Sequence, residues 1–445
     1  MPNEKNTDVG GTSELFTVIE IGTETIKVLI GGVASNAEDD ECPRICIYGM
    51  GRAFSNNVDD SNMPIHIRKG EILNVDPVRR QIELAIHEAE VDSGMDVRDT
   101  NLYVGVTGQF VRAENVEAAV SGKNKQISEE DLLRAQKIGI EKCVSEIDGS
   151  NEMLHLCMRY FKTEQGITYD VSNLHTRNLH AFMKAAIFTN RPRYYTLKRM
   201  IQDATDGMEP IFLYTATVPT YARNDVNERE KHSLAIDIGA GLTLFSLNSM
   251  PGLIEFGHIP VGCNHIENDL MLGLEIDWEV AQHLVHMLDS IYAELASEEG
   301  RRTVRLRHKG GQKEREVPMS SIVAIVEARL EEIFQLVKRE LVVRNVFDMI
   351  HGKVFVSGGG AMLPNVCEIA SRVLELPAEI AKPGSEYLCT TGGDFLDDPR
   401  WIVPLGMMRM AITDNQIKKL LKDDKARGGS TLDIVGKILK IMTNW

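Results

Sequence analysis

The stretch Leu234-Ala-Ile-Asp-Ile-Gly-Ala-Gly-Leu-Thr-Leu-Phe-Ser-Leu247 lies just past the middle of the 445-residue chain. It consists of an apolar run, an aspartate, two glycines separated by one residue, a threonine and a second apolar run. Two short apolar runs joined by a glycine-containing turn are typical of a buried β-hairpin. Glycines in such a turn let backbone N–H groups approach a ligand closely. The pattern therefore predicts a phosphate-binding hairpin.

A related pattern occurs near the start of the chain. The segment Val18-Ile-Glu-Ile-Gly-Thr-Glu-Thr-Ile-Lys-Val-Leu-Ile30 again has an apolar run, an acid, a Gly-Thr turn and a returning apolar run. Its composition predicts a second strand-turn-strand unit. Two such hairpins, far apart in the chain, predict two similar half-molecules that face one polyphosphate.

The charge of the chain limits its partners. It has 49 basic and 65 acidic residues, a formal net charge of -16, which argues against non-specific binding of nucleic acid by the body of the protein. The segment Glu298 to Lys313 is rich in arginine, but it has no interleaved aromatic residues. Its alternating Val304 and Leu306 favour a solvated hairpin over a nucleic-acid patch. We expect no nucleic-acid partner.

The cysteines and the N-terminus predict a cytoplasmic location. The seven cysteines are odd in number and scattered, which fits a reducing compartment better than a disulfide framework. Cys42 and Cys46 have the spacing of half a metal site, but no second pair follows. Residues 1–14 lack the pattern of a signal peptide, and no segment reaches the roughly 20 apolar residues of a membrane-spanning helix.

The order of the patterns predicts two α/β domains, the first interrupted by an insert. The insert is expected to be a compact α+β unit with a helix that begins near Ser128. The predicted divisions are as follows: 1–107 and 188–230 as the first domain (IA), 108–187 as the insert (IC), 231–272 and 318–410 as the second domain (IIA), 273–317 as a small subdomain (IIB), 411–430 as a flexible linker, and 431–445 as a terminal helix.

A third glycine turn follows a strand-like run in the second domain. Residues Lys353-Val-Phe-Val-Ser-Gly-Gly-Gly-Ala-Met-Leu-Pro-Asn365 predict a strand, three consecutive glycines and a helix start. Alone, such a triplet indicates only a turn. After two phosphate hairpins, we interpret it as the place where a nucleotide base or ribose lies flat on the backbone.

The last fifteen residues form an amphipathic pattern. On a helical wheel, one half collects the apolar residues Leu432, Ile434, Val435, Ile438, Leu439, Ile441, Met442 and Trp445, and the other half carries Lys437 and Lys440. Residues 411–445 contain seven basic and four acidic residues, a net charge of +3. This composition predicts a helix that lies in the surface of an anionic membrane. The alternatives are a helix docked on the second domain or in a groove of a partner.

Together these features resemble the actin-like ATPase superfamily, whose fold is shared by actin, 70-kDa chaperones and sugar kinases. Within it, the sequence is similar to the FtsA family of bacterial cell division. Apart from the amphipathic terminus, the resemblance is carried by Glu20 to Thr23, Leu102 to Gly108, Asp237 to Gly241, Gly262 to Leu270, Arg329 to Ile333 and Val356 to Gly360. It implies a two-lobed α/β fold with an SHS2-type insert and a C-terminal amphipathic helix.

The resemblance also implies a site for ATP and Mg²⁺. Asp237 and Glu20 would face the Mg²⁺ through its waters, as hard oxygen ligands do. Gly358, Gly359 and Gly360 would lie at the adenosine, and Gln282 near the ribose. The residues implied around the phosphates are Gly22, Thr23, Thr25, Asp237, Gly239, Ala240, Gly241 and Thr243.

The partners implied by the resemblance are those of a membrane adaptor. Residues 273–317 would bind the C-terminal peptide of tubulin-like FtsZ, and residues 108–187 would contact later division proteins and neighbouring copies in a filament. The terminal helix would hold the protein on the inner face of the cell membrane at the division site. A pilus-type actin-like scaffold and a small-molecule kinase of the same superfold remain alternatives.

Several residues depart from the family pattern. Ala240, Leu242 and Leu244 replace glycine or polar residues of the second hairpin, and Gln282 and Val285 stand where the family has a glutamate and a lysine. These changes make the phosphate cradle less polar. We therefore expect at most a weak or slow ATPase, and the sequence offers no lone candidate for a catalytic base.

Overall fold

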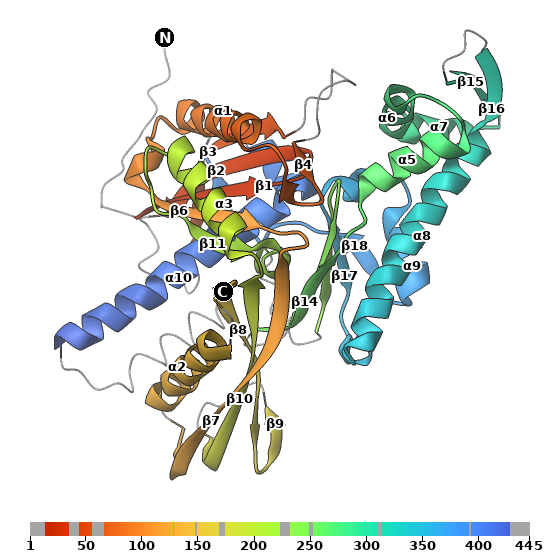
Figure 1. The fold of residues 1–445 in the computed structure, drawn as a ribbon. Coiled ribbons are helices and arrows are strands. Elements are labelled where there is room, and N and C mark those ends of the chain that lie inside the picture. Colours follow the sequence, from red (N-terminus) through yellow and green to blue (C-terminus); the bar gives the residue numbers. More distant parts are fainter. Residues whose placement is uncertain are drawn as a thin grey trace.

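The computed structural model shows two lobes and an insert below them (Figure 1). The first lobe contains the N-terminal hairpin, and the second contains the hairpin at Leu234 to Leu247. The structure describes residues 14–34, 44–55, 66–127, 129–146, 149–168, 174–222, 232–248, 252–298, 300–309, 314–390 and 393–427.

A six-stranded sheet forms the first lobe. Its order is β11-β6-β1-β2-β3-β19, in which β1, β2 and β3 are antiparallel and β6 and β11 run parallel to β1. Helices α1 and α10 pack on opposite faces (Figure 1). The elements of this lobe are β1 (Leu15–Ile21), β2 (Thr25–Val33), β3 (Ile45–Phe54), β4 (Ile67–Arg68), β5 (Glu71–Ile72), α1 (Val75–Ser93), β6 (Asn101–Val106), α3 (Arg191–Ala204), β11 (Ile211–Tyr214), β19 (Tyr387–Cys389) and α10 (Ile402–Arg427).

The second lobe repeats this topology. Its sheet has the order β14-β13-β12-β17-β18, again three antiparallel strands followed by two parallel ones. The elements are β12 (Leu234–Ile238), β13 (Thr243–Asn248), β14 (Leu253–Ile259), α5 (Cys263–Gly273), α6 (Trp278–His286), α7 (Leu288–Ala296), β15 (Thr303–Arg307), β16 (Glu314–Pro318), α8 (Met319–Val343), β17 (Val354–Ser357), α9 (Val366–Leu374) and β18 (Ala378–Ile380). The repetition of strand order confirms two similar halves.

The insert has its own sheet and core. The sheet, β7-β10-β8-β9, is antiparallel, and α2 packs against β7 and β10. Its elements are β7 (Val111–Gln126), α2 (Glu129–Glu146), β8 (Glu152–Thr163), β9 (Gly166–Thr168) and β10 (His175–Phe188). Buried Val116, Phe161 and Leu179 belong to a cluster separate from those of the two lobes. The predicted α/β, actin-like fold class with an α+β insert is confirmed.

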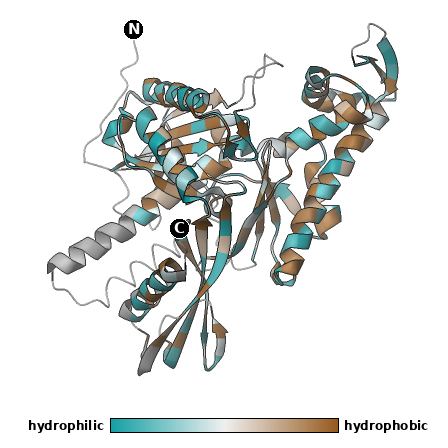
Figure 2. Cartoon of the chain, viewed as in Figure 1, coloured by the Kyte–Doolittle hydropathy of each residue, from teal (hydrophilic) through white to brown (hydrophobic). Residues whose placement is uncertain are grey.

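Hydrophobic and hydrophilic residues alternate along α1, α2 and α8 (Figure 2). In α1 the buried residues are Val78, Ile82, Ala85, Ile86 and Ala89, which recur at the three- and four-residue spacing of one helix face. That face lies against β2 and β3. The apolar residues that recur at helical spacing in the sequence therefore form the face of α1 that covers the sheet.

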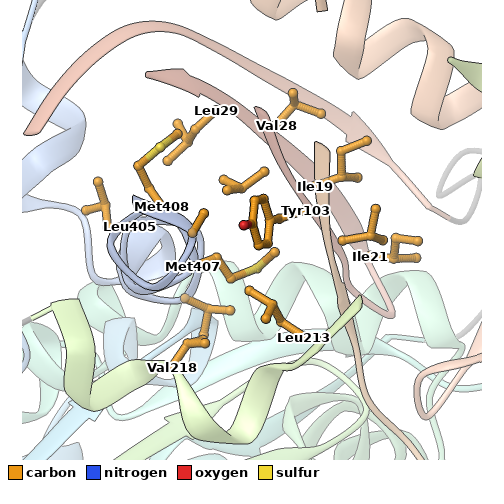
Figure 3. Packing of buried hydrophobic residues seen from close by; sticks show 14 of the residues in the cluster. Ile19, Ile21, Val28, Leu29, Tyr103, Leu213, Val218, Leu405, Met407 and Met408 are labelled. Carbon is orange, nitrogen blue, oxygen red and sulfur yellow. The ribbon is translucent and has the colours of Figure 1, made fainter. Parts of the chain in front are cut away.

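The predicted end of the second domain differs from the structure. The sequence assigns residues 318–410 to that domain, but β19 pairs with β3 of the first sheet. Leu405, Met407 and Met408 of α10 pack in the core of the first lobe (Figure 3). The chain thus returns to the first lobe after β18. This return depends on contacts with strands hundreds of residues earlier, which local patterns do not reveal.

The predicted linker is also wrong over residues 411–427, because α10 continues to Arg427. The segment is polar, but it contains no glycine or proline and is rich in lysine, leucine and alanine, which favour helices. Residues 428–430 and the predicted membrane helix at 431–445 lie outside the described residues. In the ranges that the structure describes, no helix combines the length and apolar character needed to span a membrane.

The contact between β3 and α1 depends on two glycines. A Cβ placed on Gly51 would lie 1.8 Å from the Ala85 carbonyl oxygen, and one on Gly49 would lie 2.4 Å from that of Ala89. The helix therefore packs directly on the strand backbone.

We expect Gly51→Ala to lower the free energy of unfolding by about 2 kcal/mol, because overpacking of a filled core typically costs 1–3 kcal/mol. Denaturant unfolding measures the change. Gly149→Ala is the matched control, since a Cβ at Gly149 meets nothing within 4 Å. Equal unfolding midpoints for the two variants would contradict the packing argument.

Candidate functional site

The turns of the two predicted phosphate hairpins touch. The Gly22 N–H donates to the Thr25 carbonyl oxygen at 3.0 Å in the first turn, and the Gly239 N–H donates to Leu242 at 2.9 Å in the second. A Cβ placed on Gly241 would lie 2.6 Å from Thr23 Oγ1. Glycine is required at position 241 because any larger residue would push the two turns apart. The structure thus brings together two segments that the sequence separates.

A third turn, which the sequence analysis missed, meets both hairpins. Lys69 and Gly70 connect β4 to β5 and both have positive φ, 49° and 73°. The Gly70 N–H donates to Thr23 Oγ1 at 3.3 Å, and Lys69 Cα would lie 3.2 Å from a Cβ on Gly241. The Lys-Gly pair between short extended segments is a turn signal. This turn adds a lysine to the junction of the lobes.

The second hairpin is anchored through its carbonyl groups. The N–H groups of Cys263 and Asn264, at the start of α5, donate to the carbonyls of Gly239 and Ala240 at 2.9 Å each. Within the described ranges, the N–H groups of Ala240 and Gly241 donate no hydrogen bond. Successive backbone N–H groups in a turn are suited to binding an anion. The backbone of the hairpin is therefore held in place by α5, while the N–H groups of Ala240 and Gly241 are available to bind an anion.

The two predicted acidic residues lie near each other but have different environments. Asp237 is buried, and its Oδ2 accepts a hydrogen bond from Ser357 Oγ at 2.7 Å. Burial and the charge of Glu20 raise the pKa of Asp237 to about 6, against the lowering effects of Ser357 and Lys27. Glu20 pairs with Lys27 at 2.7 Å. The effect of the Glu20 charge on the pKa of Asp237 indicates that the two carboxylates are near each other.

The glycine triplet lies beside Asp237. Gly358 has a positive φ of 82°, and a Cβ there would lie 3.0 Å from Asp237 Oδ1. A Cβ placed on Gly360 would lie 2.5 Å from Ile238 Cγ2, so Gly360 packs directly against this side chain. A Cβ on Gly359 would meet nothing within 4 Å. The triplet therefore continues the second hairpin, with an open stretch of backbone at its centre.

Three other residues that the sequence analysis singled out have different environments. The Thr243 hydroxyl is buried and donates to the Val261 carbonyl oxygen at 2.8 Å. Gln282 is on α6, and among the described residues no hydrogen bond joins it to the hairpins. Leu244 is buried in the core of the first lobe. Leu244 thus serves packing between the lobes, which gives a structural reason for its departure from the family pattern.

Two carboxylates oppose each other across the lobes, and the sequence analysis did not single out either. Glu24 is in the turn of the first hairpin, and Glu267 is on α5 of the second lobe. Burial and, to a smaller extent, the negative charge of Glu24 together raise the pKa of Glu267 to about 7. The charge of Glu24 thus disfavours ionisation of Glu267 across the boundary between the lobes.

Two lobes of the same strand order, which meet through glycine turns, define a protein of the actin-like class. Solved structures agree with this fold. The PilM–PilN type IV pilus biogenesis complex matches with a TM-score of 0.59 and 13% identity, covering 90% of this chain and 98% of that chain. MreB5 of Spiroplasma citri bound to ADP matches with a TM-score of 0.52 and 14% identity, covering 92% and 98%.

Comparison with known sequences shows which proteins of this class the chain resembles. The family described as cell division protein FtsA matches residues 234–406. FtsA of Borreliella burgdorferi is 26% identical over 411 residues, covering 92% of this chain and 93% of the relative. FtsA of Bacillus subtilis is 25% identical over 421 residues, covering 91% and 85%. The chain is thus similar to cell-division proteins of the FtsA family along most of its length.

We expect Glu267→Gln to change how stability depends on pH. A carboxyl whose pKa is raised by folding destabilises the protein as pH rises from its ordinary 4.5 through about 7, because the folded state resists ionisation. The wild type should therefore lose melting temperature over this window more steeply than Glu267→Gln, and the two should converge at its acidic end.

Thermal unfolding across the same pH window measures this difference. Glu279→Gln, which removes an exposed carboxylate from neighbouring α6, should follow the wild-type profile. Parallel curves for the wild type and Glu267→Gln would contradict an unfavourable charge at this position.

Proposed function

We propose that this division protein is an ATP-binding adaptor that assembles through its actin-like lobes. It would tether FtsZ filaments to the inner face of the cytoplasmic membrane at the division site and help to recruit later division proteins. The observation that carries the proposal is the contact of Gly241 with Thr23, because it joins both glycine hairpins at one junction between the lobes.

The nucleotide would bind at this junction. The backbone N–H groups of Ala240 and Gly241 and the turn at Thr23 supply hydrogen-bond donors for the phosphates, and the open backbone at Gly359 offers a surface for the adenosine. The related fold of MreB5 of Spiroplasma citri has been solved with ADP and with AMPPNP. Gln282 would approach the ribose from α6.

Glu20 and Asp237 are the proposed Mg²⁺ residues. Mg²⁺ usually keeps several waters and binds one or two carboxylates together with substrate phosphates. In the described part of the chain no group of three or more His, Cys, Asp or Glu is arranged to hold a metal, so a binding mode that needs only these two carboxylates is the one that fits. When bound, Mg²⁺ would neutralise phosphate charge and lower the pKa of Asp237.

Hydrolysis would be slow at most. Leu242 and Leu244 of the second hairpin are buried and apolar, so neither side chain can orient a water. The hydroxyl of Thr243 already donates to a backbone carbonyl. We propose that ATP acts mainly by holding the lobes together, and we assign no catalytic base.

Membrane attachment would use Leu432, Val435, Ile438, Leu439, Met442 and Trp445, with Lys437 and Lys440 toward anionic headgroups. Helix α10 supports this role, because its first turns are buried in the first lobe and the rest extends away from the body (Figure 1). Its 26 residues span about 39 Å at 1.5 Å per residue. The helix would thereby carry the terminal segment away from the lobes.

The remaining partners are assigned to two surfaces. Residues 273–317, which include α6, α7 and the β15–β16 hairpin at the far end of α8 (Figure 1), would bind the C-terminal peptide of FtsZ. The insert, residues 108–187, would contact later division proteins and a neighbouring copy in the filament. Both surfaces project from the lobes and leave the nucleotide junction free.

The membrane proposal is tested by sedimentation with anionic phospholipid vesicles, with and without Mg·ATP. Ile438→Glu should lower bound protein about tenfold or more, because burial of one isoleucine contributes roughly 1.5–3 kcal/mol and each 1.4 kcal/mol is a factor of ten. Mg·ATP should increase binding of the wild type, since assembled copies bind with several helices at once.

The matched control is Thr443→Glu, which adds the same charge on the polar half of the helix and should retain most binding. A chain that ends at Arg427 should remain in the supernatant. Equal sedimentation of the full chain, Ile438→Glu and the shortened chain would contradict the tether. If Mg·ATP has no effect on the wild type but Ile438→Glu still loses vesicle binding, only nucleotide-dependent assembly is contradicted.

A further inference from the structure

A large cavity lies between the insert and the second lobe, away from the hairpin junction. Its volume is about 690 Å³, within the range of roughly 300–1,000 Å³ that is common for small-molecule sites. Strands β7, β8 and β10 of the insert form one side, and β14 with the residues that follow α8 forms the other. β8 and β14 lie side by side here (Figure 1).

Three cationic side chains from different elements converge on one carboxylate in this cavity. Glu255 is 2% exposed, and Lys184, 5% exposed, donates to its Oε1. Arg344 Nη1 donates to the same oxygen at 2.8 Å. Arg159 Nη2 is 3.8 Å from Glu255 Oε2. The four groups, of which Glu255, Lys184 and Arg159 are buried and Arg344 is partly exposed, form what we call the Glu255 cluster.

The arginines are held in place by further contacts. Arg159 Nε donates to the Ile254 carbonyl oxygen at 2.6 Å, and its Nη1 donates to Asn115 at 3.0 Å. Arg344 also donates to the Phe256 carbonyl oxygen and to Glu340, both at 3.1 Å. These bonds fix the guanidinium groups before any ligand arrives, which reduces the ordering cost of binding.

The cluster has an excess of positive charge. Lys184, Arg159 and Arg344 face Glu255, and Arg112 at the cavity wall pairs with Glu114. Even when Glu114 and the Glu340 partner of Arg344 are counted, four cations meet three carboxylates. Burial lowers the pKa of Lys184, Glu255 raises it, and Arg344 and Arg159 lower it again. Burial is therefore the main cause of the lowered pKa, and the excess of positive charge rests on the count of charged groups.

The lining of the cavity is also partly apolar and aromatic. It includes Tyr160, Ile167, Tyr214, Phe256, Val346 and Met349. Such a combination of fixed charges with apolar walls is typical of sites for small organic ligands. Guanidinium and ammonium groups are the usual protein partners of phosphate oxygens.

The geometry points to a second ligand site in this cavity, which binds a small organic phosphate through Lys184, Arg159 and Arg344. The phosphate supplies the negative charge that the Glu255 cluster lacks, and the organic part lies on the apolar wall. Because the cations come from the insert and from the second lobe, the bound phosphate links these two parts of the molecule. This site is independent of ATP binding at the hairpins.

Phenyl phosphate is a suitable probe, and inorganic phosphate and benzoate test the two halves of the assignment. Isothermal titration calorimetry with the full chain at constant ionic strength should show phenyl phosphate binding more tightly than inorganic phosphate or benzoate. Lys184→Gln should weaken phenyl phosphate binding about tenfold, because a hydrogen bond to a charged group contributes roughly 1.5–3 kcal/mol. Glu255→Gln should tighten it, since the opposing carboxylate is removed.

Two controls assign the binding to this cavity. Lys137→Gln removes an exposed lysine from α2 of the insert and should leave phenyl phosphate binding unchanged, as should Lys69→Gln at the hairpin junction. Loss of binding in Lys69→Gln with retention in Lys184→Gln would overturn the proposal in favour of the nucleotide site. Absence of binding in the wild type, or equal binding of benzoate, would also overturn it.

The opposite effects of Lys184→Gln and Glu255→Gln separate a ligand site from a purely structural ion cluster. Both variants remove a partner from the buried cluster, so both should lower the melting temperature without ligand. Phenyl phosphate should restore stability to Glu255→Gln more than to Lys184→Gln. If neither variant responds to phenyl phosphate, the Glu255 cluster serves only to hold the insert on the second lobe.

Discussion

The architecture depends on the close approach of two β-turns. Gly241 leaves no space for a side chain, because a Cβ there would lie 2.6 Å from Thr23 Oγ1. The Lys69–Gly70 turn also contacts this junction, because the Gly70 N–H donates a hydrogen bond to Thr23 Oγ1. Each lobe thus supplies one glycine hairpin to a shared junction, and the carbonyls of the second hairpin are fixed by α5. This constraint explains why two sheets of the same topology face each other.

Two opposing effects act across the junction. Leu244 from the second lobe lies in the core of the first, and Tyr214 of the first lobe hydrogen-bonds His258 of the second at 2.6 Å, so packing and polar contacts hold the lobes together. Glu24 and Glu267 repel each other across the same boundary. The packing and polar contacts therefore stabilise the boundary between the lobes, whereas the two carboxylates destabilise it.

The sequence predicted the elements whose patterns are local. Four features have the expected secondary structure: the hairpins at Val18 to Ile30 and Leu234 to Leu247, the triplet at Gly358, and the insert. Glycine turns and the spacing of apolar residues depend on neighbouring residues, so the sequence is enough to predict them. The return of β19 and α10 to the first lobe was missed, since it depends on pairing with β3. The Glu24–Glu267 pair arises only when the lobes meet. The roles of the predicted nucleotide residues remain predictions.

The central claim is that both hairpins form one nucleotide site. Hydrogen–deuterium exchange measured with and without Mg·ATP tests it directly, through the backbone amides of Thr23 and Glu24 in one hairpin and of Ala240 and Gly241 in the other. We predict slower exchange in both hairpins at the same nucleotide concentration. Unchanged exchange in both, or protection confined to one hairpin, would contradict a shared site between the lobes.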